Sequence, residues 1–186
     1  MGTTRKVAVI VGSLRKGSYN RMTAKALAAL SPAGLHLEIV EIGQLPLYNQ
    51  DADDAPPSEW VAFREKVKAA DAVLFVTPEY NRSVPGVLKN AIDVGSRPYG
   101  QSVWDRKPGA VISVSVGAIG GFGANHHLRQ SCVFLNVPMM QQPEAYIGAC
   151  TTLFDKEGNL TNEHTRESLQ KFIDAFAAWI EVNLVH

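Results

Sequence analysis

Residues 7–20 read VAVIVGSLRKGSYN, and the pattern of this stretch indicates the class of fold. The first five residues, Val7 to Val11, are apolar without alternation, as in a parallel strand that helices cover on both faces. Gly12 then allows a sharp exit from the strand, and the run from Met22 to Leu27 suits a helix. The stretch therefore predicts a central parallel strand, a short loop and a helix, which together are one unit of an α/β protein.

The loop between this strand and helix is rich in hydrogen-bond donors, because it contains Ser13, Arg15, Ser18 and Asn20. A helix N-terminus has unpaired N–H groups and positive dipole character, so an anion is stabilised there. The loop lacks the closely spaced glycines of a dinucleotide fingerprint and the Gly-Lys-Ser/Thr ending of a Walker A loop. It therefore predicts a site for the terminal phosphate of a mononucleotide. The alternative is that Ser18 or Asn20 only caps an ordinary helix.

A second apolar run, residues 71–76, leads into TPEYNRSVPG at residues 77–86. Pro78 fixes its own φ and favours extended geometry at Thr77, so the chain leaves this strand stiffly. Such a rigid segment can present N–H and C=O groups to the polar edge of a flavin ring while Tyr80 packs on the ring. Ser83 is the expected cap of the helix that continues to Ile92. The alternative is a plain turn with an exposed Glu79.

Further strands are expected at residues 35–40, 110–114 and 144–147, with helices at 60–69, 125–135 and 163–184. This alternation predicts an α/β fold of three layers. Residues 115–123, after the strand at 110–114, contain four glycines that leave room for a ligand. The proline-rich and acidic loop at residues 45–57 also follows a strand end, so we expect it near the ligand.

The chain resembles the NADPH-dependent FMN reductase family, in particular its bacterial chromate and quinone reductase branch. The resemblance covers nearly the whole chain and rests on the glycine and serine loop at residues 12–20, the TPEYN segment with the helix after it to Asp93, and Lys107-Pro108. It implies a flavodoxin-like three-layer sandwich with a five-stranded parallel sheet in the order 2-1-3-4-5. Residues 1–186 would then form a single FMN-binding domain.

The resemblance also assigns residues to the cofactor. Ser13, Arg15, Ser18 and Asn20 would hold the FMN phosphate. The isoalloxazine ring would contact Pro78, Glu79, Tyr80 and Asn81, with Ser115 and Gly117 on its far side. A homodimer or homotetramer is implied as well. The visible departures from the family are Arg82 and the pair His126-His127, which leave the substrate preference open.

The loops, together with the family resemblance, predict an oxidoreductase that uses FMN and takes electrons from NADPH or NADH. It would reduce quinones and also chromate by a ping-pong hydride mechanism. No set of catalytic side chains and no metal site can be assembled from the sequence. Little acid–base chemistry by the protein is needed, because the flavin itself supplies the redox chemistry. Arg82 is a candidate contact for an anionic acceptor or a nicotinamide phosphate, and the alternative is a solvated or subunit-interface arginine. The rival hypothesis is a flavodoxin-like electron carrier or sensor that turns over no pyridine nucleotide.

Composition narrows the possible partners. The 186 residues carry a formal net charge of zero, which argues against nucleic acid as a partner and against the acidic docking face of an electron carrier. No apolar run reaches transmembrane length and the start has no signal-peptide pattern, so we expect a cytoplasmic protein without membrane insertion. Cys132 and Cys150 have neither CxxC nor metal-ligand spacing, and we expect no redox role for either.

Overall fold

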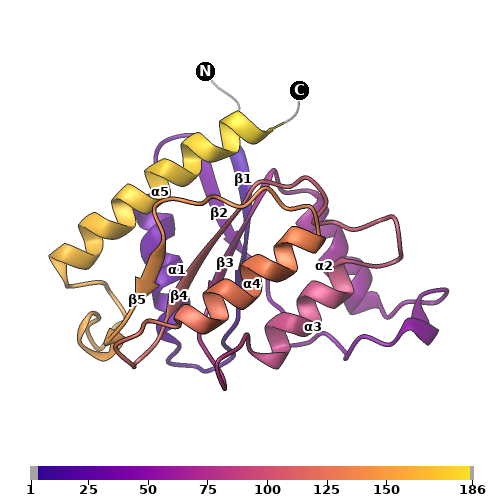
Figure 1. Cartoon of the computed structure of the whole chain (residues 1–186), viewed down its shortest axis with the longest axis horizontal. Coiled ribbons are helices and arrows are strands. Elements are labelled where there is room, and N and C mark those ends of the chain that lie inside the picture. Colours follow the sequence, from indigo (N-terminus) through magenta and orange to yellow (C-terminus); the bar gives the residue numbers. More distant parts are fainter. Residues whose placement is uncertain (1–3, 185–186) are drawn as a thin grey trace.

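The computed structural model describes residues 4–184, in which five parallel strands form one sheet (Figure 1). The strand order is β2-β1-β3-β4-β5. This order confirms the flavodoxin-like arrangement, in which the direction of strand succession reverses between β1 and β3. The strands are β1 (Arg5–Val11), β2 (Leu35–Ile39), β3 (Ala72–Thr77), β4 (Gly109–Val114) and β5 (Ala145–Ile147).

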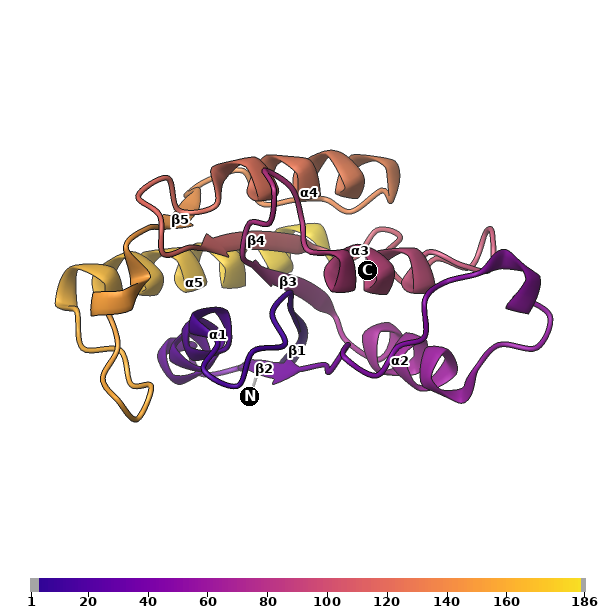
Figure 2. The same ribbon diagram turned by 90° about the horizontal axis from the view of Figure 1, so that it is seen from below.

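Helices cover both faces of the sheet (Figure 2) and complete the three predicted layers. One face packs against α1 (Tyr19–Leu30) and α5 (Glu163–Asn183). The other face packs against α2 (Ser58–Lys68), α3 (Gly86–Gly95) and α4 (Phe122–Phe134). Two short 3-10 helices, η1 (Gln50–Ala52) and η2 (Cys150–Thr152), lie in the connections after β2 and β5.

The central strands β3 and β4 are apolar except for Thr77 and Ser113, because both of their faces are buried. Every residue of β3 and of β4 is buried. The last helix, α5, has a buried apolar stripe, so it is an amphipathic helix packed on the sheet. Its buried residues in contact with the core are Leu169, Phe172, Ile173, Phe176 and Ile180.

The parallel register brings three loops together at the carboxyl edge of the sheet. Val11 pairs with Val76, and Thr77 pairs with Ser113, so β1, β3 and β4 end side by side. The Gly12 N–H donates to the Val76 carbonyl at 2.9 Å and extends this ladder into the loop. A Cβ at Gly12 would lie 3.1 Å from Leu88 and 3.3 Å from Pro78. Glycine therefore permits the loops after β1 and β3 to approach each other closely.

Serine was expected to cap the helices after β1 and β3, and only the first of these caps is present. Ser18 is the N-cap of α1, since its Oγ accepts from the Arg21 N–H at 3.2 Å. The expected Ser83 cap is wrong, because α3 begins at Gly86 with Pro85 as its N-cap residue. The Ser83 backbone instead closes a hairpin with Tyr80, and its hydroxyl lies 2.8 Å from His127 Nδ1.

The loop at residues 45–57 does not line the cavity described below. It folds back on α2 and α3 instead (Figure 2). The Tyr48 N–H donates to Asn90 Oδ1 at 2.8 Å, and Trp60 Nε1 donates to the Pro46 carbonyl at 3.0 Å. These contacts with the two helices hold the loop away from the predicted ligand. Within residues 4–184 no helix has the length and hydropathy needed to span a bilayer.

Gly95, the last residue of α3, gives a stability prediction. A Cβ at this position would lie 2.6 Å from the indole of Trp104, which is fully buried and donates from Nε1 to the Ile92 carbonyl. Because the indole cannot yield, Gly95→Ala should lower the free energy of unfolding by about 1–3 kcal/mol in a denaturant titration. Gly86→Ala in the same helix is the control, since a Cβ there meets no atom within 4 Å. Equal stability of the two variants would contradict this packing argument.

Candidate functional site

A hollow of about 120 Å³ lies at the carboxyl edge of the sheet, between the loops that follow β1, β3 and β4. This is the place at which open α/β sheets bind ligands, because the strand order reverses there. The hollow brings together most of the predicted site residues, while Asn81 and Gly117 lie outside its lining. The predicted residues that line it are Ser13, Arg15, Ser18, Asn20, Pro78, Glu79, Tyr80 and Ser115.

The β1 side of the hollow has the donors that a phosphate needs. Ser13 and Ser18 are 5% and 2% exposed, respectively. The Ser18 oxygen accepts from the first turn of α1, so its own hydroxyl proton stays available for an anion. Arg15 is exposed and forms no ion pair with any residue between 4 and 184. The cap that was the alternative to a phosphate site is therefore present and compatible with one.

Asn20 supplies a complementary signal, because its Oδ1 is buried without a hydrogen-bond partner. Its Nδ2 donates to the Val114 carbonyl at 3.4 Å, and the residue is 4% exposed. A buried acceptor without a donor is destabilising, so it calls for a hydroxyl or amide from a ligand. This set of groups fits the ribityl phosphate part of FMN. The serine hydroxyls and the guanidinium suit the phosphate, and the Asn20 oxygen suits a hydroxyl of the ribityl chain.

The β3 side of the hollow is a tight two-residue hairpin. The Tyr80 N–H donates to the Ser83 carbonyl at 3.0 Å, and the Ser83 N–H donates back to Tyr80 at 2.9 Å. Asn81 and Arg82 between them have φ of 51° and 62°, as in hairpin turns that need positive φ at both central positions. The Tyr80 amide is therefore already used. The Glu79 and Asn81 amides, which donate to no backbone carbonyl within residues 4–184, stay available to a ligand.

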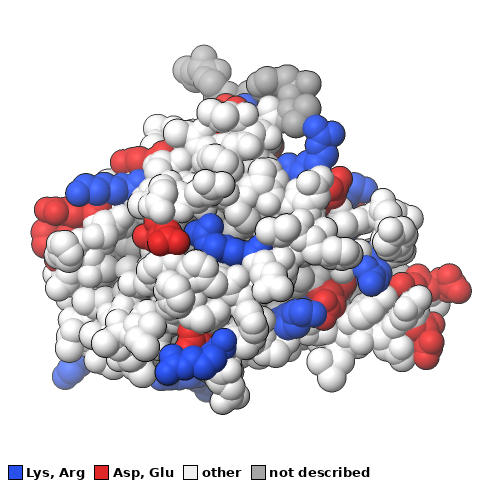
Figure 3. All heavy atoms as spheres, viewed as in Figure 1, with Lys and Arg blue, Asp and Glu red and all other residues white. Residues whose placement is uncertain are grey.

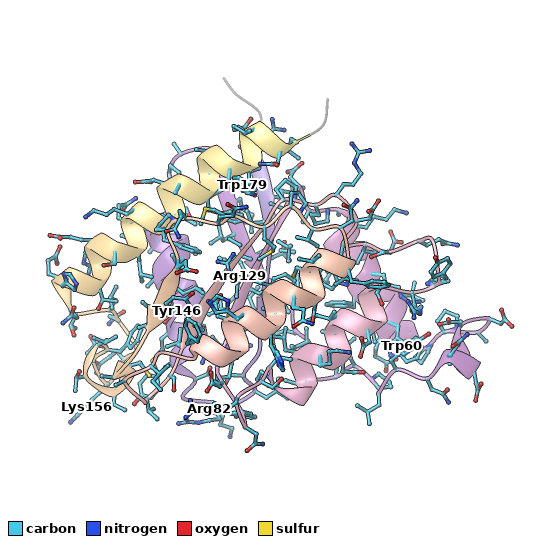
Figure 4. All side chains as sticks on the ribbon, in the orientation of Figure 1. Trp60, Arg82, Arg129, Tyr146, Lys156 and Trp179 are labelled. Atoms are coloured by element: carbon cyan, nitrogen blue, oxygen red, sulfur yellow. The ribbon has the colours of Figure 1, made fainter. Side chains whose placement is uncertain are left out.

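Glu79 and Arg82 form an ion pair within this loop. Glu79 Oε1 accepts from Arg82 Nη1 at 3.0 Å, and the exposed fractions of the two side chains are 10% and 75%. Glu79 is thus nearly buried, which contradicts the alternative of a plain turn with an exposed glutamate. Arg82 projects at the lower edge of the molecule in Figure 4, beyond the strand ends. Its guanidinium is accessible to an anion in solution.

The β4 side of the hollow is a folded turn. Ser115 Oγ accepts from the Gly117 N–H at 3.2 Å, and the Ser115 N–H donates to the Ile147 carbonyl at 2.9 Å. Gly117 itself accepts from Gly120, where φ is 65°. A Cβ at Gly120 would lie 2.7 Å from the backbone of Tyr146. The glycines thus let this turn pack directly on β5, beside the Ser115 hydroxyl in the lining.

The histidine pair His126-His127 is split between two neighbours. His127 Nδ1 lies 2.8 Å from Ser83 Oγ, whereas His126 Nε2 lies 3.0 Å from the Tyr146 hydroxyl. Desolvation, with a hydrogen bond to Glu144 as a further cause, raises the pKa of Tyr146 to about 12, so this hydroxyl stays protonated at neutral pH. Neither histidine lines the hollow. This placement favours a surface or interface role for the pair over donation of a proton to a bound quinone.

The sequence did not point to Tyr19, Val114, Val116 or Cys150, which complete the lining. Cys150 follows β5 within three residues, so the rule that ligands lie at strand carboxyl ends could have found it. Burial raises the pKa of the Cys150 thiol despite the nearby Arg15, and burial raises that of Cys132 to about 12. Both thiols are therefore protonated and poorly nucleophilic at neutral pH. Residues 4–184 contain no cluster of three His, Cys, Asp or Glu side chains suited to a metal.

Comparison with known proteins shows which family the chain belongs to. Residues 5–152 match the family model described as NADPH-dependent FMN reductase. The chain belongs to the NADPH-dependent FMN reductase family. FMN and a nicotinamide electron donor, the cofactors predicted from the sequence, are those of this family.

Relatives in this family are similar over almost their whole length. A Pseudomonas putida protein named quinone reductase is 64% identical over 184 residues, which are 98% of each chain. A Burkholderia protein named 2-hydroxy-1,4-benzoquinone reductase is 53% identical over 94% of this chain and 96% of its own. The solved structure of FerB, a flavoenzyme NAD(P)H:(acceptor) oxidoreductase from Paracoccus denitrificans, has a TM-score of 0.92 at 43% identity. It covers 97% of this chain and 100% of its own.

The phosphate side of the hollow can be tested by comparing two flavins. Arg15→Ala should raise the dissociation constant of FMN about tenfold or more, since a hydrogen bond between charged groups is lost. Riboflavin, which lacks the phosphate, should bind the variant and the parent protein almost equally. Quenching of flavin fluorescence by the apoprotein measures both constants. Lys16→Ala is the matched control, because this neighbouring cation does not line the hollow. An equal loss of riboflavin and FMN affinity in Arg15→Ala would refute the assignment.

Proposed function

We propose that this protein is an FMN-dependent NAD(P)H:quinone oxidoreductase. The observation that carries the proposal is the hollow itself, where the donor-rich loop after β1 meets the rigid hairpin after β3. The names of the Pseudomonas and Burkholderia relatives support quinones as the acceptor class. In the proposed reaction, NAD(P)H, a proton and a quinone give NAD(P)⁺ and a hydroquinone, so two electrons pass from donor to acceptor.

Different residues of the hollow would bind different parts of FMN. Ser13, Arg15 and Ser18 would bind its phosphate, and Asn20 Oδ1 would accept from a hydroxyl of the ribityl chain. The free amides of the hairpin would hold the polar edge of the ring. When bound, FMN supplies the redox chemistry by accepting a hydride and passing electrons on. The protein's own task is then binding, orientation and stabilisation of the charge on the reduced ring.

A ping-pong order suits this open site. The hollow lies at an exposed edge of the sheet, where Tyr80 is 51% exposed and Val116 is 61% exposed. An apolar rim of this kind can receive a nicotinamide and then, after the nicotinamide leaves, a quinone in the same place. Both are planar rings that a flavin can stack. We therefore propose that the two substrates bind alternately.

Chromate is a second proposed acceptor, reduced opportunistically at the same site. The accessible guanidinium of Arg82 is the observation that favours it, since an oxyanion binds readily to an exposed arginine. We also propose that the protein assembles as a homodimer or homotetramer. The exposed Val133 and Phe134 at the end of α4 support an association of this kind, with exposed fractions of 79% and 81%.

The function can be tested with the purified protein under anaerobic conditions. NADPH or NADH should bleach the visible flavin bands, and 1,4-benzoquinone added afterwards should restore them. Steady-state rates at several quinone concentrations should give parallel double-reciprocal lines, as a ping-pong order requires. Chromate in place of quinone tests the second acceptor. A protein that binds FMN but is not bleached by either nucleotide would be an electron carrier or sensor, and intersecting lines would refute the ping-pong order.

A further inference from the structure

The helix α4 begins without a cap of its own. Its N-cap residue is Gly121, at a φ of 77°, with no side-chain hydrogen bond to the first turn, and this turn contains no acidic residue. The first N–H groups of any helix have no partner within the helix and need one elsewhere. Glu79 Oε2 supplies one, accepting from the Ala124 N–H at 3.1 Å. A carboxylate from the hairpin loop after β3 therefore caps the helix after β4.

Both oxygens of this carboxylate are engaged. Oε2 accepts from α4, and Oε1 accepts from Arg82 Nη1 at 3.0 Å. The Glu79 side chain is only 10% exposed, and a carboxylate so far removed from water is stable only with such partners. The positive end of the α4 dipole adds to the stabilisation. The contact is thus a charged hydrogen bond in a shielded place, which is stronger than one at the surface.

Close packing fixes the geometry of this contact. A Cβ at Gly123 would lie 3.0 Å from Glu79 Oε2 and 3.0 Å from the Arg82 carbonyl oxygen. At Gly121 a Cβ would lie 3.0 Å from the Ser113 Cβ. The start of α4 therefore lies directly against the hairpin, and glycine at position 123 is what allows the carboxylate to reach the Ala124 amide.

We propose that Glu79 is a positioning residue, whose carboxylate locks the hairpin to α4 and thereby fixes the two walls of the flavin site. Pro78 and Tyr80 beside it line the hollow from the β3 side, and Ser115 lines it from the segment that leads into α4. This contact would hold the Glu79 and Asn81 amides, which are free of backbone partners, in place toward the ring. This inference rests on the proposed function and adds to it what sets the affinity and the redox potential.

Loss of the contact between Glu79 and the start of α4, which we call the lock, should weaken the binding of reduced FMN more than that of oxidised FMN. Reduction places negative charge on the polar edge of the ring, and N–H groups held there stabilise that charge. If the hairpin loosens, both forms lose affinity, and the reduced form loses more. The midpoint potential of the bound flavin then becomes more negative, by about 30 mV for each tenfold difference between the two dissociation constants of this two-electron couple.

Three variants of the full chain test the proposal. Glu79→Ala should raise the dissociation constant of oxidised FMN about tenfold and shift the midpoint potential of bound FMN to a more negative value. Glu79→Gln should keep the dissociation constant within about threefold of the parent value and the midpoint potential close to it, because its amide oxygen still accepts from the Ala124 N–H. Glu181→Ala is the matched control. It removes a carboxylate that pairs with Arg5 at 2.7 Å, at the opposite end of β1, and should change neither quantity.

Unchanged potential and FMN affinity in Glu79→Ala would overturn the proposal, as would a Glu79→Gln variant as impaired as Glu79→Ala. If Glu79→Ala does not fold, Gly123→Ala disturbs the same contact from the helix side and should shift the potential in the same direction. A potential equal to that of the parent would then refute the lock. Failure of the proposed function would appear in the parent protein, as no bleaching by NADPH or NADH. The lock is judged only by differences between the variants and the parent.

Discussion

The adjacency of β1 and β3 in the sheet is the constraint on which the site depends. These strands are neighbours in space although β2 lies between them in sequence, and Val11 and Val76 are paired at their ends. The chain leaves β1 toward α1 on one face and leaves β3 toward α3 on the other. The two loops therefore diverge above and below the sheet, and the hollow between them is a direct result of the strand order.

The two sides of that hollow are built by different means. On the β1 side, side chains provide the groups that would bind a ligand. Serine hydroxyls, a guanidinium and the Asn20 amide line the hollow near the start of α1. On the β3 side, the backbone provides it. Asn81 and Arg82 both adopt positive φ, which costs non-glycine residues about 1 kcal/mol or more each. Such a conformation persists because the Tyr80–Ser83 pairing and the Glu79–Arg82 ion pair both hold it.

The difference between the two sides explains what could be predicted from the sequence. The strands, the layers and the donor-rich loop after β1 follow from local patterns, namely apolar runs without alternation and donors at a helix start. The hairpin depends on tertiary contacts. Ser83 has the composition of a helix cap, but its pairing with Tyr80 moves the helix start to Gly86. The loop at residues 45–57 also follows a strand end, yet Asn90 and Trp60 hold it on α2 and α3 instead.

The capping of α4 by Glu79 could not be predicted from the sequence either, because the helix was expected from residue 125 and begins at Phe122. The residues before Phe122 are glycines rather than Ser, Thr, Asp or Asn, so the first turn needed a partner from elsewhere. What the sequence hides is which distant side chain supplies it.

Charge and exposure at this edge bear on the choice between a reductase and an electron carrier. Carriers dock on protein partners through a surface of one sign, whereas Lys, Arg, Asp and Glu side chains are interspersed on the face drawn in Figure 3. The exposed side chains that rim the hollow are the Tyr80 ring, the apolar Val116 and a single cation, Arg15. A rim of this composition attracts small planar molecules through burial of apolar surface and does little to orient a charged protein. A nicotinamide and a quinone both need an open apolar rim through which a small ring can reach polar groups deeper in the hollow. The site has both features, which supports the reductase over the carrier.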